Sequence, residues 1–152
     1  MPDIIHRIGT TAPATAVYDA VATPSGIAGW WSHATSGESR VGGVITSKFH
    51  NPDGVEIGAF EYELLTLRPD EEVRWRITAG PDEWVGTDIH FRISRDGDHT
   101  IVLFAHRGWR EEVEFMAHCS MKWGVFLLSL RDFVETGAGQ PSPVDRKIDN
   151  WN

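Results

Sequence analysis

Hydrophobic residues in the last third of the chain recur at the spacing of a helix. Within the segment from Glu112 to Gly137 they lie three, four or seven positions apart, at Met116, Trp123, Leu127, Leu130 and Val134. This spacing places their side chains on one face of a helix. The pattern predicts one long C-terminal helix with an apolar face turned toward the rest of the protein.

The region before this helix alternates hydrophobic and polar residues, which is the pattern of half-buried strands. It predicts strands over residues 44–49, 55–67, 73–78, 84–95 and 100–109. Turn sequences separate several of them, notably Asn51-Pro52-Asp53-Gly54 and Asp96-Gly97-Asp98. In the last of these strands both faces are so apolar that inward and outward positions stay unassigned.

The N-terminal region predicts one more strand and two short helices. The strand runs from Asp3 to Gly9. Thr11 is the expected N-cap of the first helix, because Pro13 fits the first turn, where a missing N–H costs little. The second helix is expected from Ser25 to Trp31, and residues 32–43, rich in Gly and Ser, are predicted to form a loop.

These elements predict an α+β fold in which hairpins form an antiparallel sheet and the helices cover one face. A chain of 152 residues suffices for one such domain. We expect residues 1–137 to form a ligand-binding domain and residues 138–152 to form a tail that is loose or pinned by Trp151. A long helix on a strongly curved sheet touches it at the ends and leaves a hollow between them.

Several large side chains are predicted on the surfaces that would enclose this hollow. The expected ligand-binding residues are Trp31, Phe60, Tyr62, Trp75, Phe91, His106, Met116 and Trp123. Each of them alone is more often a core residue, but together they favour a pocket for a flat apolar molecule. Tyr62 or His106 would fix its orientation by hydrogen bonding.

The charge of the chain argues against nucleic acids and anionic membranes as partners. Its 14 basic and 22 acidic residues give a net charge of −8, which repels phosphate groups. No run approaches 18 uninterrupted apolar residues, and no signal peptide is visible, so membrane insertion and secretion are not expected. Cys119 is the only cysteine, which excludes an intramolecular disulfide and fits the cytoplasm.

No catalytic or metal site is legible in the sequence, and no bound cofactor is expected. His118 and Cys119 are adjacent and would point about 100° apart on a helix, which suits a metal poorly. His90 and His106 could supply further ligands only if their strands pair. Asp88 and His90 would share a strand face as an acid–base pair, but on the outer face such a pair is ordinarily solvated.

The chain resembles the START-like helix-grip superfamily, also called SRPBCC, and within it the homologues of the heat-shock-protein (Hsp90) ATPase activator. The matching features are Trp30-Trp31, Gly42-Gly43 before a strand, the Val73-Arg74-Trp75 strand, and the stretch from Cys119 to Gly137. The resemblance implies a curved antiparallel sheet wrapped around the long C-terminal helix, with two short helices after the first strand. It transfers no catalytic motif.

Three functions stay open on this basis. The leading hypothesis is binding of a small hydrophobic or aromatic molecule for transport, sensing or sequestration, since the expected cavity is lined by apolar and aromatic side chains. The second is an enzyme of the polyketide cyclase or dehydratase type, which requires a titratable side chain inside the cavity. The third is an interaction module, either a chaperone cofactor or a homodimer that uses the sheet edge or the Trp151 tail.

Overall fold

The computed structural model describes residues 1–152 and confirms the expected α+β helix-grip architecture. The elements follow one another as β1 (Ile4–Thr10), α1 (Ala14–Ala22), α2 (Pro24–Ala28), β2 (Ala34–Gly37), β3 (Val44–His50), β4 (Glu56–Arg68), β5 (Glu72–Ala79), β6 (Asp88–Asp96), β7 (His99–Arg107) and α3 (Glu114–Thr136). No helix is long and apolar enough to cross a membrane.

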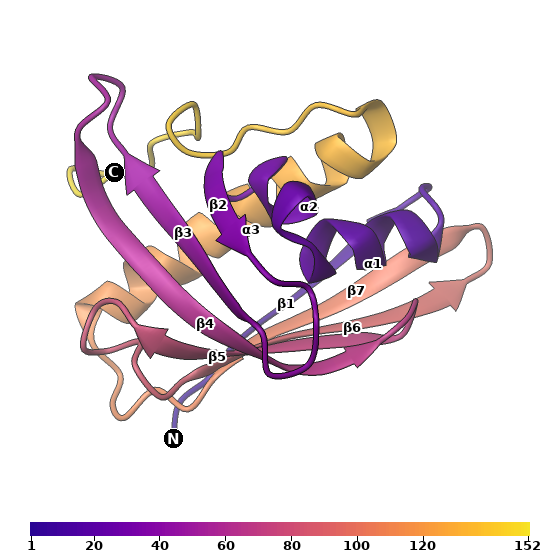
Figure 1. Ribbon diagram of the computed structural model, residues 1–152, viewed down its shortest axis with the longest axis horizontal. Coiled ribbons are helices and arrows are strands. Elements are labelled where there is room, and N and C mark those ends of the chain that lie inside the picture. The colour runs from indigo at the N-terminus through magenta and orange to yellow at the C-terminus, as the bar shows by residue number, and fades with distance from the viewer.

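All seven strands form one antiparallel sheet in the order β1-β7-β6-β5-β4-β3-β2. Strands β3 to β7 follow one another as hairpins, as the turn sequences predicted, whereas β1 pairs with β7 at the far side. The sheet curves strongly, and all three helices lie on its concave side (Figure 1). In this strand order, β1 and β2 are the two edges of the sheet.

Side chains alternate between the two faces in β5 and β6, as their sequence predicted. Trp75 is fully buried on the inner face. On the outer face the Asp88 carboxylate accepts hydrogen bonds from Arg74 at 2.8 Å and Arg76 at 2.6 Å, while His90 contacts Glu72 at 2.5 Å. Asp88 and His90 thus pair with other charged neighbours and not with each other.

Two local predictions near the N-terminus are wrong. Pro13, and not Thr11, occupies the N-cap of α1, and it makes no side-chain capping bond. The Thr11 N–H instead donates to Glu135 Oε2 at 3.3 Å, so Thr11 contacts α3 and does not cap α1. The predicted loop 32–43 also contains a strand, β2, because pairing with β3 overrides the low strand propensity of Ala34–Gly37.

The turn before β6 is a further correction that matters for the site. The strand predicted over residues 84–95 begins only at Asp88, because Pro81 opens a turn closed by the Trp84 N–H, which donates to the Pro81 carbonyl at 2.9 Å. The turn directs the Trp84 side chain inward, where only 5% of it is exposed. An indole is thereby added to the concave side of the sheet.

Aromatic rings dominate the interior. The largest fully buried side chains include Trp30, Trp31, Trp75, Trp109, Trp123, Tyr62, Phe91 and Phe104. The rings of Trp75 and Phe91 lie 5.0 Å apart, and those of Phe104 and Trp123 lie 4.6 Å apart, so they pack directly between sheet and helix. The middle of the expected hollow is filled.

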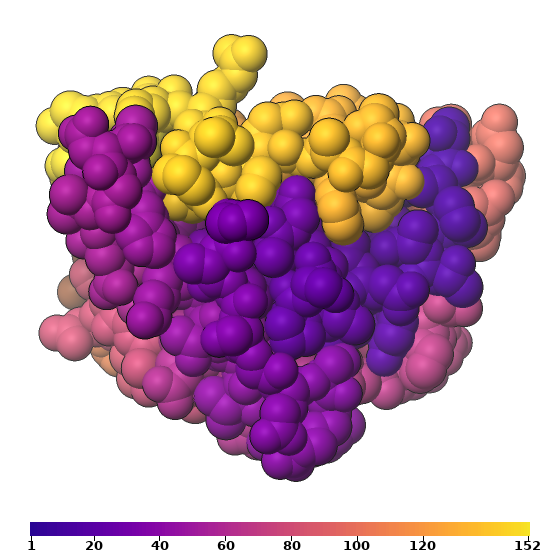
Figure 2. Space-filling model, turned by 45° about the horizontal axis from the view of Figure 1, so that its top comes forward, coloured from indigo at the N-terminus to yellow at the C-terminus, as the bar shows by residue number.

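The C-terminal residues 138–152 fold back over the end of α2 and over α3 (Figure 2). Ser142 anchors this tail: its N–H donates to the Trp31 carbonyl at 2.9 Å, and its Oγ contacts both backbone groups of His50 at 3.1 Å. A Cβ at Gly139 would lie only 2.5 Å from the Gly29 carbonyl oxygen, so the backbone of the tail packs directly against the residue that follows α2. The division into a domain and a tail at residue 137 stays a prediction.

Candidate ligand-binding site

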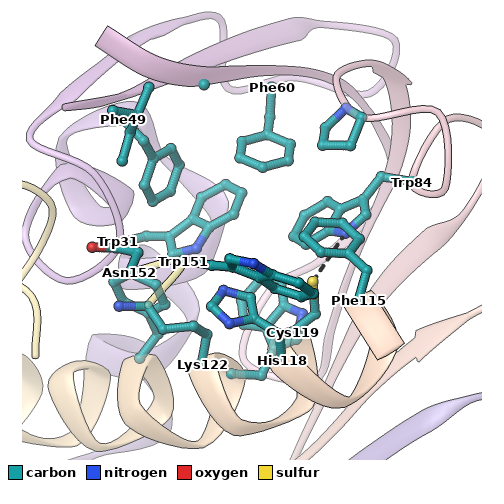
Figure 3. Close-up of a pocket in the computed structure, with 15 residues that line it drawn as sticks. Trp31, Phe49, Phe60, Trp84, Phe115, His118, Cys119, Lys122, Trp151 and Asn152 are labelled. Atoms are coloured by element: carbon teal, nitrogen blue, oxygen red, sulfur yellow. Dashed lines mark hydrogen bonds between the residues drawn. The ribbon is translucent and has the colours of Figure 1, made fainter. Parts of the chain in front are cut away.

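A cavity of about 190 Å³ lies between β4, the turn before β6 and the first half of α3. It is flanked by Phe49 and Phe60 on the strands and by His118, Cys119 and Lys122 on α3, with Trp31, Trp84 and Phe115 between them (Figure 3). The complete lining is Trp31, Phe49, Ile57, Gly58, Phe60, Pro81, Trp84, Phe115, His118, Cys119, Lys122, Trp123, Phe126, Trp151 and Asn152.

Three of the lining indoles are nearly parallel. The planes of Trp31 and Trp84 differ by 7°, those of Trp31 and Trp123 by 16°, and those of Trp84 and Trp123 by 20°, with ring centroids between 5.4 and 6.4 Å apart. Phe60 leans on Trp84 at 4.4 Å. The wall of the cavity therefore presents flat apolar surfaces, which suit a flat guest.

A chain of hydrogen bonds holds two of these indoles in place. The Trp123 indole N–H can only donate, so the His106 Nδ1 at 3.2 Å accepts. The other ring nitrogen, Nε2, then carries the proton and donates to Thr87 Oγ1 at 2.8 Å, whose hydroxyl donates to the Trp84 carbonyl at 2.5 Å. This donor order assigns the neutral Nε2–H tautomer to His106.

Burial keeps the groups beneath the indoles uncharged. Loss of solvent lowers the pKa of His106 to about 3, because the imidazolium would be stranded among aromatic rings. Burial likewise raises the pKa of the Cys119 thiol to about 12, and its sulfur receives the Trp84 indole N–H at 3.4 Å. Both residues therefore position the indoles and do not act as charged or nucleophilic groups.

The mouth of the cavity is polar and is closed partly by the tail. His118 Nδ1 lies 2.6 Å from the Asp149 carboxylate, and this hydrogen bond lowers the pKa of Asp149. Lys122 Nζ lies 2.5 Å from the Asp145 carboxylate and 2.8 Å from the Arg146 carbonyl. The Trp151 ring contacts the His118 ring at 5.4 Å. Residues of α3 and of the C-terminal tail that follows it thus build the rim together.

The predicted site residues separate into two groups. Trp31, Phe60 and Trp123 line the cavity. The other predicted residues do not line it: Tyr62, Trp75, Phe91 and His106 are fully buried in the core, and Met116 is partly buried against it. For both groups, contact with a ligand stays a prediction.

Tyr62 has the hydrogen-bond partner that a buried phenol requires. Its hydroxyl lies 2.7 Å from Ser47 Oγ, which in turn lies 2.8 Å from Thr35 Oγ1, and burial raises the pKa of Tyr62. The hydroxyl is thus occupied by β3 and β2 and does not face the cavity. His90 and His106 lie on opposite faces of the sheet, and no three His, Cys, Asp or Glu side chains are grouped as metal ligands.

Sequence reasoning missed most of the rim. Phe115 precedes the apolar stripe that identified α3, His118 lies between two of its members without belonging to it, and Trp84 was assigned to a strand. Trp151 offered a signal, because it is the one large aromatic residue of a polar tail.

Comparison with known proteins identifies a family. The sequence profile described as "Activator of Hsp90 ATPase homolog 1-like protein" matches residues 11–135. The solution structure of the Aha1 dimer from Colwellia psychrerythraea is similar with 40% identity and a TM-score of 0.78, over 91% of this chain and 100% of that chain. No curated protein matches the sequence.

More distant structures share the fold alone. A crystal structure from Staphylococcus saprophyticus is 18% identical, with a TM-score of 0.72, over 91% of this chain and 95% of that chain. CalU16 from Micromonospora echinospora is 22% identical, with a TM-score of 0.70, over 93% of this chain and 77% of that chain.

Proposed function

The chain belongs to the family of activator of Hsp90 ATPase homolog 1-like proteins within the START-like superfamily, and from this premise we propose that it binds a small aromatic molecule. The observation that carries the proposal is the cavity beside the parallel indoles of Trp31, Trp84 and Trp123. Ten of its 15 lining residues are hydrophobic, so most of the surface that a guest would touch is apolar.

The volume limits the size of the guest. A cavity of roughly 150 Å³ is enough for benzene in an engineered protein, so about 190 Å³ suits one ring with a small substituent. Burying about 200 Å² of apolar surface contributes about 5 kcal/mol, which corresponds to a Kd on the order of 0.2 mM. The substituent would face His118 and Asn152 at the rim, where a hydrogen bond could improve this affinity.

A titration with single-ring aromatic compounds that carry a small substituent tests the proposal. We expect tryptophan emission to change with saturation below about 1 mM, since three indoles border the cavity. Gly58→Phe should abolish the response, because Gly58 lines the cavity and a Cβ there meets nothing within 4 Å, so the new ring fills the space. Val44→Phe is the control, because Val44 is an exposed β3 residue outside the cavity. Equal responses from both variants would contradict the site.

A second candidate, proton-transfer catalysis of the polyketide cyclase type, is favoured by the His118–Asp149 pair. Asp149 holds Nδ1 of His118, while Nε2 makes no hydrogen bond, and the ring lines the cavity. A carboxylate that orients an imidazole in this way leaves the other nitrogen available as a general base. The proposed catalytic residue is therefore His118, with Asp149 as its positioning residue.

Substitution of this pair separates binding from catalysis. With a polyketone short enough for the cavity as substrate, His118→Gln should reduce turnover by about 10²-fold or more while aromatic binding remains. Asp149→Asn should lower the rate and shift its pH profile. His99→Gln is a matched control, because His99 forms a similar pair with Asp98 at 3.0 Å on an exposed hairpin. Turnover unchanged in His118→Gln would remove the catalytic proposal and leave the binding proposal intact.

We also infer that the chain forms a homodimer, because its relative from Colwellia psychrerythraea was solved as a dimer and is 40% identical over its whole length. Chaperone activation, which the family description names, is a separate prediction that co-purification with the Hsp90 of the host would test.

A further inference from the structure

The two edges of the sheet differ in how they are protected. At the β2 edge the strand has four residues, and the tail runs beside it through the bridge between Ser32 and Ser142. At the other edge, β1 has seven residues in unbroken register with β7. Between Ile4 and Thr10 there is no Lys, Pro or bulge of the kind that usually blocks pairing with another chain.

The hairpin between β6 and β7 determines which backbone groups of β1 face outward. Asp96 and His99 flank a two-residue turn, and such a pair exchanges both of its backbone hydrogen bonds. Because these bonds alternate along an antiparallel ladder, the odd-numbered residues of β7 bond to β6 and the even-numbered ones bond to β1. In β1 the even-numbered residues are therefore paired, and Ile5 and Arg7 direct their N–H and C=O groups to the open edge.

We propose that β1 is the homodimer interface, where it pairs antiparallel with β1 of a second copy and Ile5 lies opposite the partner's Ile5. In this register the outward backbone groups of the two strands face each other. Asp3 lies opposite the partner's Arg7, and Arg7 lies opposite the partner's Asp3, so the charges are complementary on both sides of the twofold axis. The proposal rests on the inferred homodimer and assigns its contact surface.

The side chains at this edge fit such a contact. Ile5 is 66% exposed, which leaves apolar surface at the proposed axis uncovered in the single chain. The Arg7 side chain is 61% exposed, and its closest acidic partner, Asp96, lies at 3.7 Å. The Asp3 carboxylate binds Arg107 and the Gly108 N–H at 2.9 and 3.0 Å, and it retains lone pairs for a second arginine.

A groove on the inner side of the β1 edge leaves space for residues of the partner. It measures about 320 Å³ and runs between β1 and α3, where it is lined by residues 6–9 and by Gly124, Leu127, Leu128 and Arg131. Leu128 is 47% exposed, and a Cβ at Gly124 would meet nothing within 4 Å. In the proposed register, residues 8 and 9 at this groove lie opposite residues 2 and 1 of the partner, so the N-terminus of the partner would cover Leu128.

Sedimentation of the full chain and two variants tests the surface. We expect a dimer for the natural sequence and for Val44→Lys, and a monomer for Ile5→Lys, which would place two ammonium groups at the axis. Ile5 and Val44 are both exposed strand residues, so the two changes should perturb folding equally little. A monomeric natural chain would overturn the homodimer itself, whereas a dimer unaffected by Ile5→Lys would overturn only the β1 surface.

A cross-link tests the register. Directly paired residues in hydrogen-bonded positions have Cα atoms about 5.5 Å apart, which lies within disulfide range. Ile5→Cys should therefore give a covalent dimer under mild oxidation, whereas Val44→Cys should not, and the buried Cys119 should not compete. Failure of Ile5→Cys to cross-link in a protein that sediments as a dimer would overturn the proposed register.

Discussion

His106 is a neutral residue inside a shell of aromatic rings, and both of its nitrogens are occupied. It links the indole of Trp123 to the backbone of Trp84 through Thr87, so one imidazole orients two walls of the cavity. An apolar residue in its place would leave the Trp123 indole N–H and the Thr87 hydroxyl without this partner. An unpaired buried donor costs about 1–3 kcal/mol, which explains why a polar residue is tolerated here.

The lowered pKa of His106 makes stability depend on pH. An unfolded histidine binds a proton near pH 6.5 and the folded one near pH 3, so the unfolded state holds more protons between these values. Stability from this residue is complete above pH 6.5 and falls by about 1.4 kcal/mol per pH unit below it. Urea titrations should give a lower free energy of unfolding at pH 5 than at pH 7. In His106→Gln most of this difference between the two pH values should disappear. An equal loss in the variant would assign the dependence to other groups.

The secondary-structure elements were predictable where side-chain periodicity and burial coincide. Trp123, Leu127 and Leu130 are buried in α3, and the alternation in β5 matches its inner and outer faces. Prediction failed where long-range contacts decide the local structure. Strand β2 exists because β3 pairs with it, and Thr11, the expected cap of α1, bonds to Glu135 of α3 instead.

The candidate site was predictable only in part, for a geometrical reason. Periodicity shows that Trp75 and Phe91 point inward, but it does not show whether inward-pointing rings enclose space or fill it. The cavity lies toward the beginning of α3, where Trp84 enters from a turn and Trp151 from the tail. Neither position follows a period of two or 3.6 residues, so neither could be placed on a face from sequence alone.

At the scale of the whole molecule, the last residues of the chain complete the wall that α3 begins. Trp151 and Asn152 line the cavity, and the tail that carries them is held by a buried ion pair. The Lys122 and Asp145 side chains are 9% and 4% exposed, and the Lys122 ammonium also lies 5.1 Å from the centre of the Phe126 ring. The attachment of the tail and the shape of the cavity therefore depend on the same contact.

Removal of one charge from this pair should destabilise the whole protein. Asp145→Asn leaves the Lys122 ammonium buried without a counter-charge, and breaking a buried pair in this way costs about 3–5 kcal/mol. The double change Lys122→Met with Asp145→Leu should recover most of this loss, since an apolar pair needs no desolvation of charge. Urea denaturation measures both effects, and aromatic titration of the single variant should show weaker binding because Trp151 is released. A loss below about 1 kcal/mol in Asp145→Asn would mean that water reaches Lys122. The tail would then be held by the hydrogen bonds of the Ser142 side chain and backbone instead.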